Sequence, residues 1–453
     1  MSRDARAIFN ATLEAADPGL AVSRHLSLDN GWLRSDGHSY RLDEYERLLV
    51  IGGGKAAARM GQALEGILAD RIDSGLLVTR RGHAAPLRRI RLVEAAHPVP
   101  DEAGMRAAQE MTALLAGLDE RTLVLCLLSG GASALMAAPA PGVQLADKQA
   151  VTDLLLKAGA AIGELNAVRK HLSAIKGGRL AKAAFPATVL TLILSDVIGD
   201  RLDVIASGPT VPDDTTFDDA AEVIGKYGLW ERLPARAAAH LRRGLEGREA
   251  ETIKKDDPCF RRTANVLVGS LSQALDAAAV RAEELGFPAQ VITRELQGEA
   301  RQAARFLAGR AQQARDALPP AGRSCLLSGG ETTVHVRGKG RGGRNQEMAL
   351  AFALEIAGAE GIELLAAGSD GSDGPTDAAG AIVDGATVAT GKKLGLDAAL
   401  FLENNDSHSF FRELDMRGGG HSHVRTGPTG TNVMDVQVIL VSAGAPGGGD
   451  END

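Results

Sequence analysis

The hexapeptide Cys-Leu-Leu-Ser-Gly-Gly occurs twice in this chain, at Cys126–Gly131 and again at Cys325–Gly330. Each copy predicts the end of a buried strand followed by a turn that only small residues can make. A third stretch, Leu49–Gly54, has the same character and is closed by Lys55. In α/β proteins such strand ends expose backbone N–H groups where anionic ligands bind. The three turns therefore indicate a phosphate-handling α/β enzyme.

The size and charge of the chain limit the classes to which it can belong. Its 453 residues exceed one ordinary hydrophobic core and predict about two domains. Glycine contributes 54 residues and aromatic residues only 3%, which favours many strand-to-helix turns over sandwich packing. A formal net charge of −8 argues against nucleic acid as a partner but allows a small anionic substrate.

Cysteine use and hydropathy bear on the compartment. The three cysteines, Cys126, Cys259 and Cys325, cannot form a disulfide framework, and two of them lie in expected core strands. The first residues lack the apolar region of a secretory signal, and no run of about 18 apolar residues follows. We therefore expect a cytoplasmic protein with no membrane partner.

Strand-like and helix-like segments alternate along the chain. Strands are expected at Arg47–Ile51, Thr122–Leu128 and Val189–Leu194, and a helix is expected at Ala56–Ala69, where apolar residues recur at helical spacing. This alternation predicts βαβ units and a parallel sheet with helices on both faces.

A change of composition marks the expected domain joint. Around Leu233–Asp257 the residues become charged, with few strong hydrophobes. The two domains are accordingly expected at residues 1–245 and 260–445, the second with a strand at Thr332–Arg337. Residues 446–453, rich in glycine and acid, are predicted to form a disordered tail.

The turn Gly52-Gly53-Gly54-Lys55 follows an expected strand and opens a helix. That position offers N–H donors at Gly53 and Gly54 to a phosphate, and Lys55 can add a full charge. The turn matches neither the complete dinucleotide fingerprint nor the P-loop. The alternative is a tight turn with a solvent-exposed lysine.

The first hexapeptide leads into a second expected anion cradle, Ser129–Leu135, with Ser133 placed as a helix N-cap or a phosphate ligand. A serine hydrolase would need the G-x-S-x-G pattern, which is absent here. The residues expected to contact nucleotide phosphates in the two hexapeptide turns are Ser129, Gly130, Gly131, Ser133, Ser328, Gly329, Gly330 and Glu331.

Two segments concentrate cations. Asn166–Arg179 includes Arg169 and Lys176, and Gly338–Glu347 places Arg344 among glycines. A solvated surface often explains such runs, but the neighbouring glycines make an anion-facing segment about equally plausible. Glycine-rich loops with arginines suit closure over a transferring phosphoryl group. Arg169 and Lys176 are therefore candidates for binding the substrate.

Three aspartates are candidates for metal or proton chemistry. Asp196 follows the most apolar strand, where it could hold Mg²⁺, accept a hydroxyl proton or simply cap a turn. Asp370 and Asp373 alternate with glycine in Gly368–Gly374, which offers oxygen ligands but lacks the remaining positions of an EF-hand.

Taken together, these segments resemble the glycerate 2-kinase family, whose C-terminal part is called the MOFRL domain. The matching stretches occur in the family's order and cover nearly the whole chain. They are Gly52–Ala57, Ser129–Leu135, Asn166–Ala181, Leu194–Asp200, Ala206–Pro212, Ser328–Val334, Gly340–Glu347, Gly368–Ala381 and Thr426–Val433.

The resemblance implies an ATP-dependent kinase that uses a divalent metal such as Mg²⁺ to phosphorylate D-glycerate at its 2-hydroxyl, giving 2-phosphoglycerate and ADP. It also implies a Rossmann-like N-terminal domain, a MOFRL-type α/β C-terminal domain and an active site in the cleft between them. An essential lysine, aspartate and arginine of the family match Lys55, Asp196 and Arg344. The residues alone do not choose between the 2- and 3-positions of glycerate, and they leave a homo-oligomer open.

The expected roles derive from the needs of phosphoryl transfer. Lys55 and Arg344 would face the phosphoryl group or the glycerate carboxylate, whereas Asp196 would orient or deprotonate the hydroxyl, or hold Mg²⁺. The residues after the two hexapeptides differ, so the two copies are expected to form two walls of one cleft rather than a duplicated unit.

Two rival functions remain. An NADP-dependent dehydrogenase acting on a small hydroxy acid would use Gly52–Gly54 for the dinucleotide and Arg80-Arg81 for a 2′-phosphate. A non-catalytic nucleotide or sugar-phosphate sensor would bind tightly without turnover. ADP formation with D-glycerate separates the three.

Overall fold

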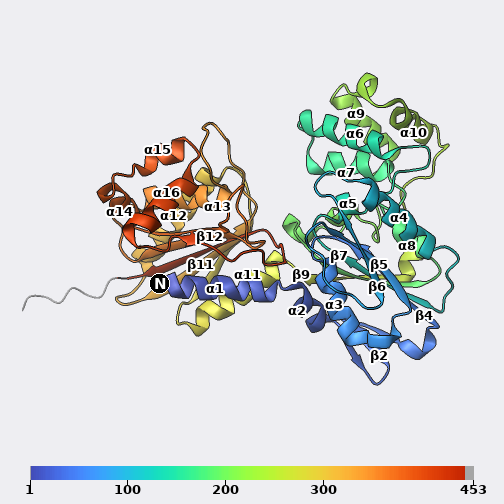
Figure 1. The fold of residues 1–453 in the computed structure, drawn as a ribbon, viewed down its shortest axis with the longest axis horizontal. Helices are drawn as coiled ribbons and strands as arrows, with labels where there is room; N and C mark the ends of the chain where they lie inside the picture. The colour runs from blue at the N-terminus through green and yellow to red at the C-terminus, as the bar shows by residue number, and fades with distance from the viewer. Residues whose placement is uncertain (1, 444–453) are drawn as a thin grey trace, which may run out of the picture. The chain divides into compact units, whose positions relative to one another are not determined.

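A computed structural model describes residues 2–443 and divides them into two compact units (Figure 1). One unit runs from Pro18 to Gly269, and we call it the parallel-sheet unit. The other, the mixed-sheet unit, joins the residues up to Asp17 with those from Ser270 onward. Among residues 2–443, no helix combines the length and the apolar character needed to cross a membrane. The expected tail, residues 446–453, lies outside the described residues.

The division differs from the expected domains of 1–245 and 260–445 at both ends. Strand β9 (Thr263–Gly269) pairs with β8 of the parallel sheet, so the first unit ends only after it. Helix α1 (Ser2–Ala15) packs on α11 (Leu271–Glu284) and therefore belongs to the second unit. The charged stretch Leu233–Asp257 lies inside the parallel-sheet unit, because its helix buries one face.

The parallel-sheet unit is built on a six-stranded, all-parallel sheet in the order β6-β5-β4-β7-β8-β9. The chain starts at the centre with β4, builds outward through β5 and β6, and then restarts beside β4 with β7. That reversal makes β4/β7 the topological switch point, where doubly wound sheets bind ligands. The strands are β4 (Arg47–Gly53), β5 (Ser74–Arg80), β6 (Ile90–Ala95), β7 (Thr122–Leu128), β8 (Thr188–Leu194) and β9.

Helices cover both faces of this sheet, as a parallel sheet requires. On one face lie α2 (Pro18–His25) and α3 (Ala57–Leu68). The other face carries α4 (Glu102–Leu114), the short α5 (Ala132–Leu135) and α8 (Arg179–Ala184), which share one hydrophobic core with the strands. A three-stranded antiparallel sheet precedes β4, formed by β1 (Ser27–Asp29), β2 (Trp32–Ser35) and β3 (His38–Arg41).

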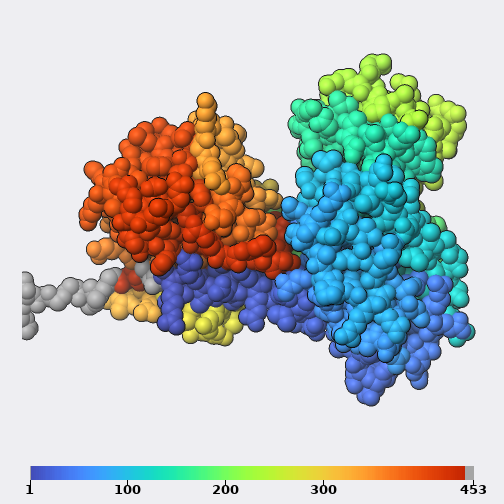
Figure 2. Space-filling view, viewed as in Figure 1, coloured from blue at the N-terminus to red at the C-terminus, as the bar shows by residue number. Residues whose placement is uncertain are grey.

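Four helices form a lobe, which Figure 2 shows in green, and they have a hydrophobic core of their own. The sequence inserts them between β7 and β9, in two pairs separated by β8. They are α6 (Leu145–Lys157), α7 (Ile162–His171), α9 (Phe217–Lys226) and α10 (Ala235–Leu245). This insertion carries much of the cation-rich Asn166–Arg179 segment to the sheet edge.

The mixed-sheet unit has a six-stranded sheet in the order β10-β11-β15-β12-β13-β14, in which only β10 and β11 pair in parallel. The central strand, β15, is antiparallel to both of its neighbours. The strands are β10 (Ala289–Leu296), β11 (Arg323–Gly330), β12 (Ile362–Gly368), β13 (Gly380–Asp384), β14 (His423–Val424) and β15 (Asp435–Ser442).

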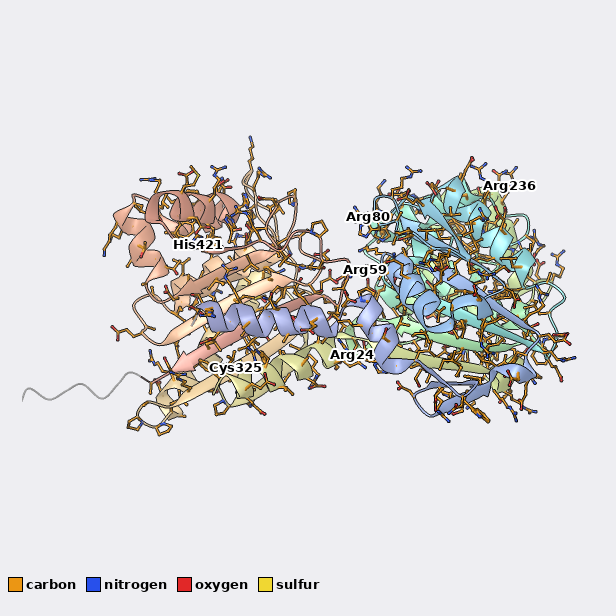
Figure 3. All side chains as sticks on the ribbon, turned by 60° about the horizontal axis from the view of Figure 1, so that its bottom comes forward. Arg24, Arg59, Arg80, Arg236, Cys325 and His421 are labelled. Carbon is orange, nitrogen blue, oxygen red and sulfur yellow. The ribbon has the colours of Figure 1, made fainter. Side chains whose placement is uncertain are left out.

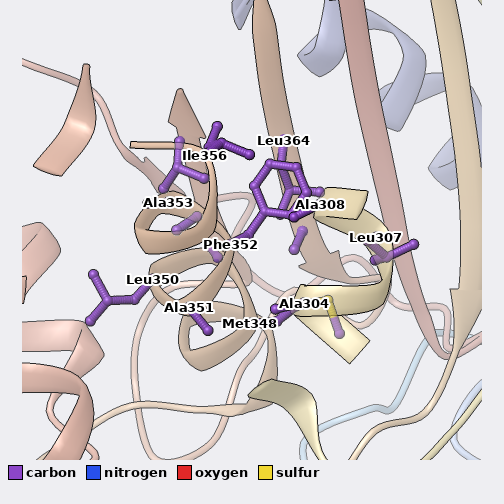
Figure 4. Close-up of a cluster of buried hydrophobic side chains, with 14 of the residues drawn as sticks. Ala304, Leu307, Ala308, Met348, Leu350, Ala351, Phe352, Ala353, Ile356 and Leu364 are labelled. Atoms are coloured by element: carbon purple, nitrogen blue, oxygen red, sulfur yellow. The ribbon is translucent and has the colours of Figure 1, made fainter. Parts of the chain in front are cut away.

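Helices α1 and α11 lie on one face of the mixed sheet, and the remaining helices of this unit lie on the other (Figure 1). Figure 4 shows the core of that second face, where Phe352 of α13 packs with Leu307 of α12 and Leu364 of β12. The helices on this face are α12 (Ala300–Ala317), α13 (Arg344–Glu355), α14 (Thr387–Lys393), α15 (Ala398–Glu403) and α16 (Ser407–Gly418).

The second hexapeptide and the segment after it differ from expectation. Strand β11 continues through Ser328, Gly329 and Gly330, all of which pair with β15, so this copy does not form a turn. The expected strand Thr332–Arg337 is wrong, because this segment has only an isolated bridge from Thr333 to Glu299. Its glycine-rich continuation packs instead against Asn404–Ser407.

Replacing Gly52 tests the backbone contact at the switch point. Gly52 has φ 133°, and a Cβ there would lie 2.0 Å from the carbonyl oxygen of Leu127 on the neighbouring strand. We expect Gly52→Ala to lower the free energy of unfolding by about 3 kcal/mol or more. Urea denaturation followed by tryptophan fluorescence measures this, because both tryptophans, Trp32 and Trp230, lie in the parallel-sheet unit.

The matched control is Gly66→Ala in the last turn of α3. A Cβ at Gly66 would meet nothing within 4 Å, so this change should stabilise the helix by up to about 1 kcal/mol. Equal effects of the two substitutions would contradict the close approach at Gly52.

Candidate functional site

Two glycine loops meet at the carboxyl ends of β4 and β7. The Lys55 N–H donates to the Gly130 carbonyl at 2.8 Å, and the Ser129 N–H donates to the Gly53 carbonyl at 3.2 Å. The Ser129 hydroxyl, which is buried, accepts from the Ala56 N–H at 3.1 Å. The Ser129 hydroxyl thus accepts the hydrogen bond of an N–H group at the start of α3 and links the two loops. Its role here is structural.

The first loop does not form the expected cradle of free N–H groups. The Gly54 N–H donates to Val78, and those of Lys55, Ala56 and Ala57 also have acceptors within the protein. Within residues 2–443 the second loop is different, since the N–H groups of Gly131 and Ser133 have no acceptor there. The donors available to an anion therefore lie on Gly131 and Ser133, while Lys55 contributes its side chain.

Cationic groups gather where the loops meet. A Cβ at Gly131 would lie 2.9 Å from the His97 ring and 3.4 Å from Cγ of Lys55, so both side chains border this glycine. Burial and then the positive charges of Lys55, Arg80 and His83 lower the pKa of His97 to about 4. Arg80, labelled in Figure 3, lies at the end of β5 and is exposed. This edge of the sheet is electropositive and suited to an anion.

Asp196 faces the same loop from the end of β8. A Cβ at Gly130 would lie 2.0 Å from Oδ2 of Asp196, so the carboxylate sits where any other residue's side chain would begin. Asp196 is half-buried. The structure therefore brings a lysine and an aspartate against successive glycines, Gly130 and Gly131, of one loop.

Ser133 is the centre of a polar cluster in which Lys176 and Ser207 are buried and Arg169 is half-buried. Its Oγ accepts from Nη2 of Arg169 at 2.6 Å and from Nζ of Lys176 at 2.7 Å, and it lies 2.9 Å from the Ser207 hydroxyl. Lys176 also donates to the carbonyls of Ser133 and Ala206, at 3.0 and 3.2 Å. The predicted residues Ser133, Arg169 and Lys176 thus come together.

Burial and neighbouring cations depress the pKa of Lys176 well below its ordinary value, and burial lowers that of Arg169. Burial also lowers the pKa of Lys148 to about 7, with Arg169 and Arg179 contributing. Burial and mutual repulsion thus disfavour the charged forms of these side chains, and a bound anion would favour them again.

Three contributors to this region were missed by sequence reasoning: His97, Lys148 and Ser207. Ser207 has φ 61°, an uncommon backbone for a serine, within the Ala-Ser-Gly-Pro turn. That turn was among the stretches that resemble the kinase family, so it was a signal that could have found Ser207. Lone His97 and Lys148 gave no comparable pattern.

In the mixed-sheet unit, the residues of the second hexapeptide that were predicted to bind phosphate form part of strand β11 and contact its neighbouring strands. The Ser328 hydroxyl is buried and donates to Oε1 of Gln437 on β15 at 2.9 Å. Gly329 and Gly330 lie in the strand pair, and Gly330 lies so close to the Leu296 backbone that no Cβ would fit. The expected turn is wrong here because the strand does not end at Ser328.

Arg344 begins α13 and is held by two carboxylates. Its guanidinium makes a two-point contact with buried Asp435, with Nε at 2.5 Å and Nη2 at 3.0 Å, while Nη1 lies 2.8 Å from Glu331. Burial alone would lower the pKa of Arg344, but Asp435 and Glu331 raise it, so the group stays charged. Glu331 is thus a partner of Arg344, and its role as a phosphate ligand stays a prediction.

The two other aspartates also have local roles. Asp373 is buried and accepts the N–H groups of Asn345 and Gln346, at 3.0 and 2.9 Å, so it caps the first turn of α13 from outside the helix. Asp370 accepts from the N–H and hydroxyl of Ser372 in its own turn. Within residues 2–443, no group of three or more His, Cys, Asp or Glu side chains could hold a metal ion.

A groove of about 560 Å³ lies beside Arg344 in the mixed-sheet unit. Thr332–Val334 and the glycine-rich loop line it, together with Glu331 and Pro375. The irregular segment that replaced the expected strand therefore forms one wall of a cavity next to the predicted arginine.

Binding of an anion beside Lys55 should change the titration of His97. Pyrophosphate would offset the positive charges that depress its pKa, so the pKa should rise from about 4 toward the ordinary value of about 6.5. NMR titration of the His97 ring protons, assigned with His97→Gln, measures this. The ring of His25, bonded to Asp36, should not respond. Saturable pyrophosphate binding without any shift at His97 would contradict this location.

Two family models match the chain: one described as a domain of unknown function (DUF4147) over residues 4–242, and the MOFRL family over residues 324–435. The glycerate 2-kinase of Pyrococcus horikoshii is 41% identical over 441 residues, 96% of this chain and 96% of that protein. A relative from Agrobacterium vitis that bears the name hydroxypyruvate reductase is 43% identical over 439 residues, 96% of this chain and 93% of its own.

A solved structure points the same way. The crystal structure of glycerate kinase from Thermotoga maritima superposes with a TM-score of 0.85 at 41% identity, covering 97% of this chain and 99% of that one. The similarity therefore extends over both the parallel-sheet and the mixed-sheet unit. The chain belongs to the glycerate 2-kinase family.

Proposed function

We propose that this protein transfers the γ-phosphoryl group of ATP to the 2-hydroxyl of D-glycerate, releasing ADP and 2-phosphoglycerate. The relatives named glycerate 2-kinase and glycerate kinase support the reaction class. The observation that carries the proposal is the pairing of Lys55 and Asp196 against Gly131 and Gly130 at the switch point of the parallel sheet. The protein's three unpaired cysteines fit the reducing cytoplasm, where we propose that it acts.

Lys55 and Asp196 have complementary roles in this proposal. Phosphoryl transfer spreads negative charge over the equatorial oxygens, which a fixed ammonium group stabilises. The Lys55 side chain, beside His97 and Arg80, provides that charge. Asp196 accepts the hydrogen bond of the substrate hydroxyl and directs its oxygen toward the phosphorus.

ATP reactions of this kind use a divalent cation, and Mg²⁺ fits the residues present. It is commonly held by one or two carboxylates, with phosphate oxygens and water completing the shell. Asp196 is the carboxylate at this edge that would hold it, and no three-residue protein cage is needed. When bound, the cation neutralises charge on the nucleotide phosphates.

In the mixed-sheet unit, Arg344 is the candidate that stabilises phosphoryl oxygens. Its contacts with Asp435 and Glu331 fix the direction of the guanidinium, and fixed donors need little reorganisation during reaction. Asp373 supports the same residue indirectly by capping α13. Asp370 and Asp373 therefore have no part in metal binding in this proposal.

The dehydrogenase alternative is supported by the two relatives from Agrobacterium vitis that are named hydroxypyruvate reductase. A dinucleotide would need free N–H groups at the first glycine turn for its pyrophosphate. The N–H groups of Gly54, Lys55 and Ala56 are all bonded within this protein. The kinase is therefore the better-supported function.

Lys55→Ala should lower kcat by about 10³-fold or more, because charge on the phosphoryl group would lose its nearest fixed cation. A coupled assay of ADP formation with ATP and D-glycerate measures this, and NMR of the product identifies the phosphorylated hydroxyl. Lys157→Ala is the control, since Lys157 is exposed and, among residues 2–443, forms an ion pair only with Asp153.

The assay also tests the activity itself. Consumption of NADPH with hydroxypyruvate, in the absence of ADP formation with glycerate, would replace the kinase with the reductase. Near-normal turnover of a folded Lys55→Ala variant would remove the role given to this lysine.

Arg344→Lys should lower kcat by about 100-fold while leaving the KM for glycerate within a few-fold. A lysine keeps the charge but cannot contact Asp435 at two points and face a phosphoryl group at once. Steady-state kinetics measures both constants. Arg305→Lys, on an exposed pair with Glu355 in the same unit, should be silent. A rise in KM alone would assign Arg344 to substrate binding instead.

A further inference from the structure

Lys176, which is buried, and Arg169, which is half-buried, form a cationic pair that has no carboxylate partner among residues 2–443. Both donate to the hydroxyl of Ser133, at 2.6 and 2.7 Å. The nearby Lys170 is also buried but is paired with Asp213 at 2.9 Å. One lysine of this segment thus has an internal counter-charge, and the pair at Ser133 does not. Buried charge without a counter-ion is unfavourable, and an anionic ligand would relieve it.

The hydrogen bonds around Ser133 have a defined direction. A hydroxyl has two acceptor positions and one donor. Because Arg169 and Lys176 occupy both acceptor positions, the Ser133 proton must point to Ser207, and Ser207 in turn donates to Oδ1 of Asn166 at 3.2 Å. The network therefore fixes the cations and offers no negative group to them.

The two cations differ in the donors that they have left. Lys176 makes three hydrogen bonds, two to Ser133 and one to Ala206, which use all three of its N–H groups. Arg169 makes one described bond, from Nη2, and a guanidinium has five N–H donors. Arg169 can thus bind a planar carboxylate with two parallel hydrogen bonds, while Lys176 adds charge behind it.

The site lies on the loop that carries the proposed chemistry. Ser133 follows Gly130 and Gly131, which border Asp196 and Lys55. A 2-hydroxy acid has its carboxylate one bond from the carbon that bears the reacting hydroxyl. If the substrate carboxylate binds beside Ser133, the reacting hydroxyl of the substrate would therefore lie near Asp196.

We infer that Arg169, braced by Ser133 and Lys176, binds the carboxylate of the 2-hydroxy acid and makes the enzyme select acids over neutral polyols. This inference rests on the proposed kinase activity. A nucleotide phosphate is the competing anion for the same donors, and the test separates the two through the KM of each substrate.

The test compares D-glycerate with D-glyceramide, its neutral amide, in the ADP-formation assay. For Arg169→Ala we expect the KM for glycerate to rise about 100-fold, the KM for ATP to stay within about 2-fold, and the activity with glyceramide to change little. The preference for the acid over the amide should collapse accordingly. Arg169→Lys keeps the positive charge but loses the two parallel N–H donors of the guanidinium. It should therefore give a smaller rise in the KM for glycerate.

The control is Arg236→Ala, on an exposed arginine of α10 in the same unit (Figure 3), which should leave every constant unchanged. Tryptophan fluorescence checks that each variant is folded, and Arg169→Lys carries the test should Arg169→Ala unfold. A selective rise in the KM for ATP would overturn the inference in favour of a nucleotide phosphate. An unchanged KM for glycerate in a folded variant would also overturn it.

The outcomes distinguish failure of the proposed function from failure of the carboxylate site. If the wild-type protein forms no ADP with glycerate, the proposed function fails before Arg169 is considered. If the wild type is active and the acid-over-amide preference persists in Arg169→Ala, only the carboxylate site fails.

Discussion

The close approach of two backbone loops at the β4/β7 switch point is the constraint on which the candidate site depends. Side chains are excluded there at three positions: Gly52 faces the Leu127 backbone, Gly54 faces Ser129, and Gly130 faces the carboxylate of Asp196. Because nothing larger than hydrogen fits, the chain can bring Lys55, His97 and Asp196 to one loop. The glycines serve close packing first, and the chemistry depends on the approach that this packing allows.

The candidate cations of the two units differ in whether a carboxylate balances their charge. In the mixed-sheet unit, Arg344 has two carboxylates and its charge is balanced within the protein. In the parallel-sheet unit, Arg169 and Lys176 are desolvated and converge on a neutral hydroxyl. Balanced charge gives a fixed orientation at little electrostatic cost, whereas unbalanced charge favours an incoming anion. These properties suit a positioning role for Arg344 and a ligand-binding role for Arg169.

Sequence reasoning located most regular elements, because the strands of the parallel sheet are continuous apolar runs between glycine turns. It correctly placed β7 at Thr122–Leu128 and β8 close to its observed bounds. It was wrong where partners distant in sequence decide the conformation. Ser328–Gly330 stays in strand β11 because β15, more than a hundred residues later, pairs with it along its whole length. Asp373 caps α13 for a similar reason.

The two hexapeptides separate local from tertiary information. Their composition determined by itself that each would begin as a buried strand and that each would allow the backbone to pass close to another segment, since these properties depend on apolar side chains and on glycine. Whether the strand then ended was decided by its neighbours. At Ser129 the chain leaves the sheet and turns into α5, exposing N–H groups beside Lys55 and Asp196. At Ser328 an antiparallel partner pairs with the strand instead, so identical residues lead into a loop with free N–H groups in one unit and stay in a paired strand in the other.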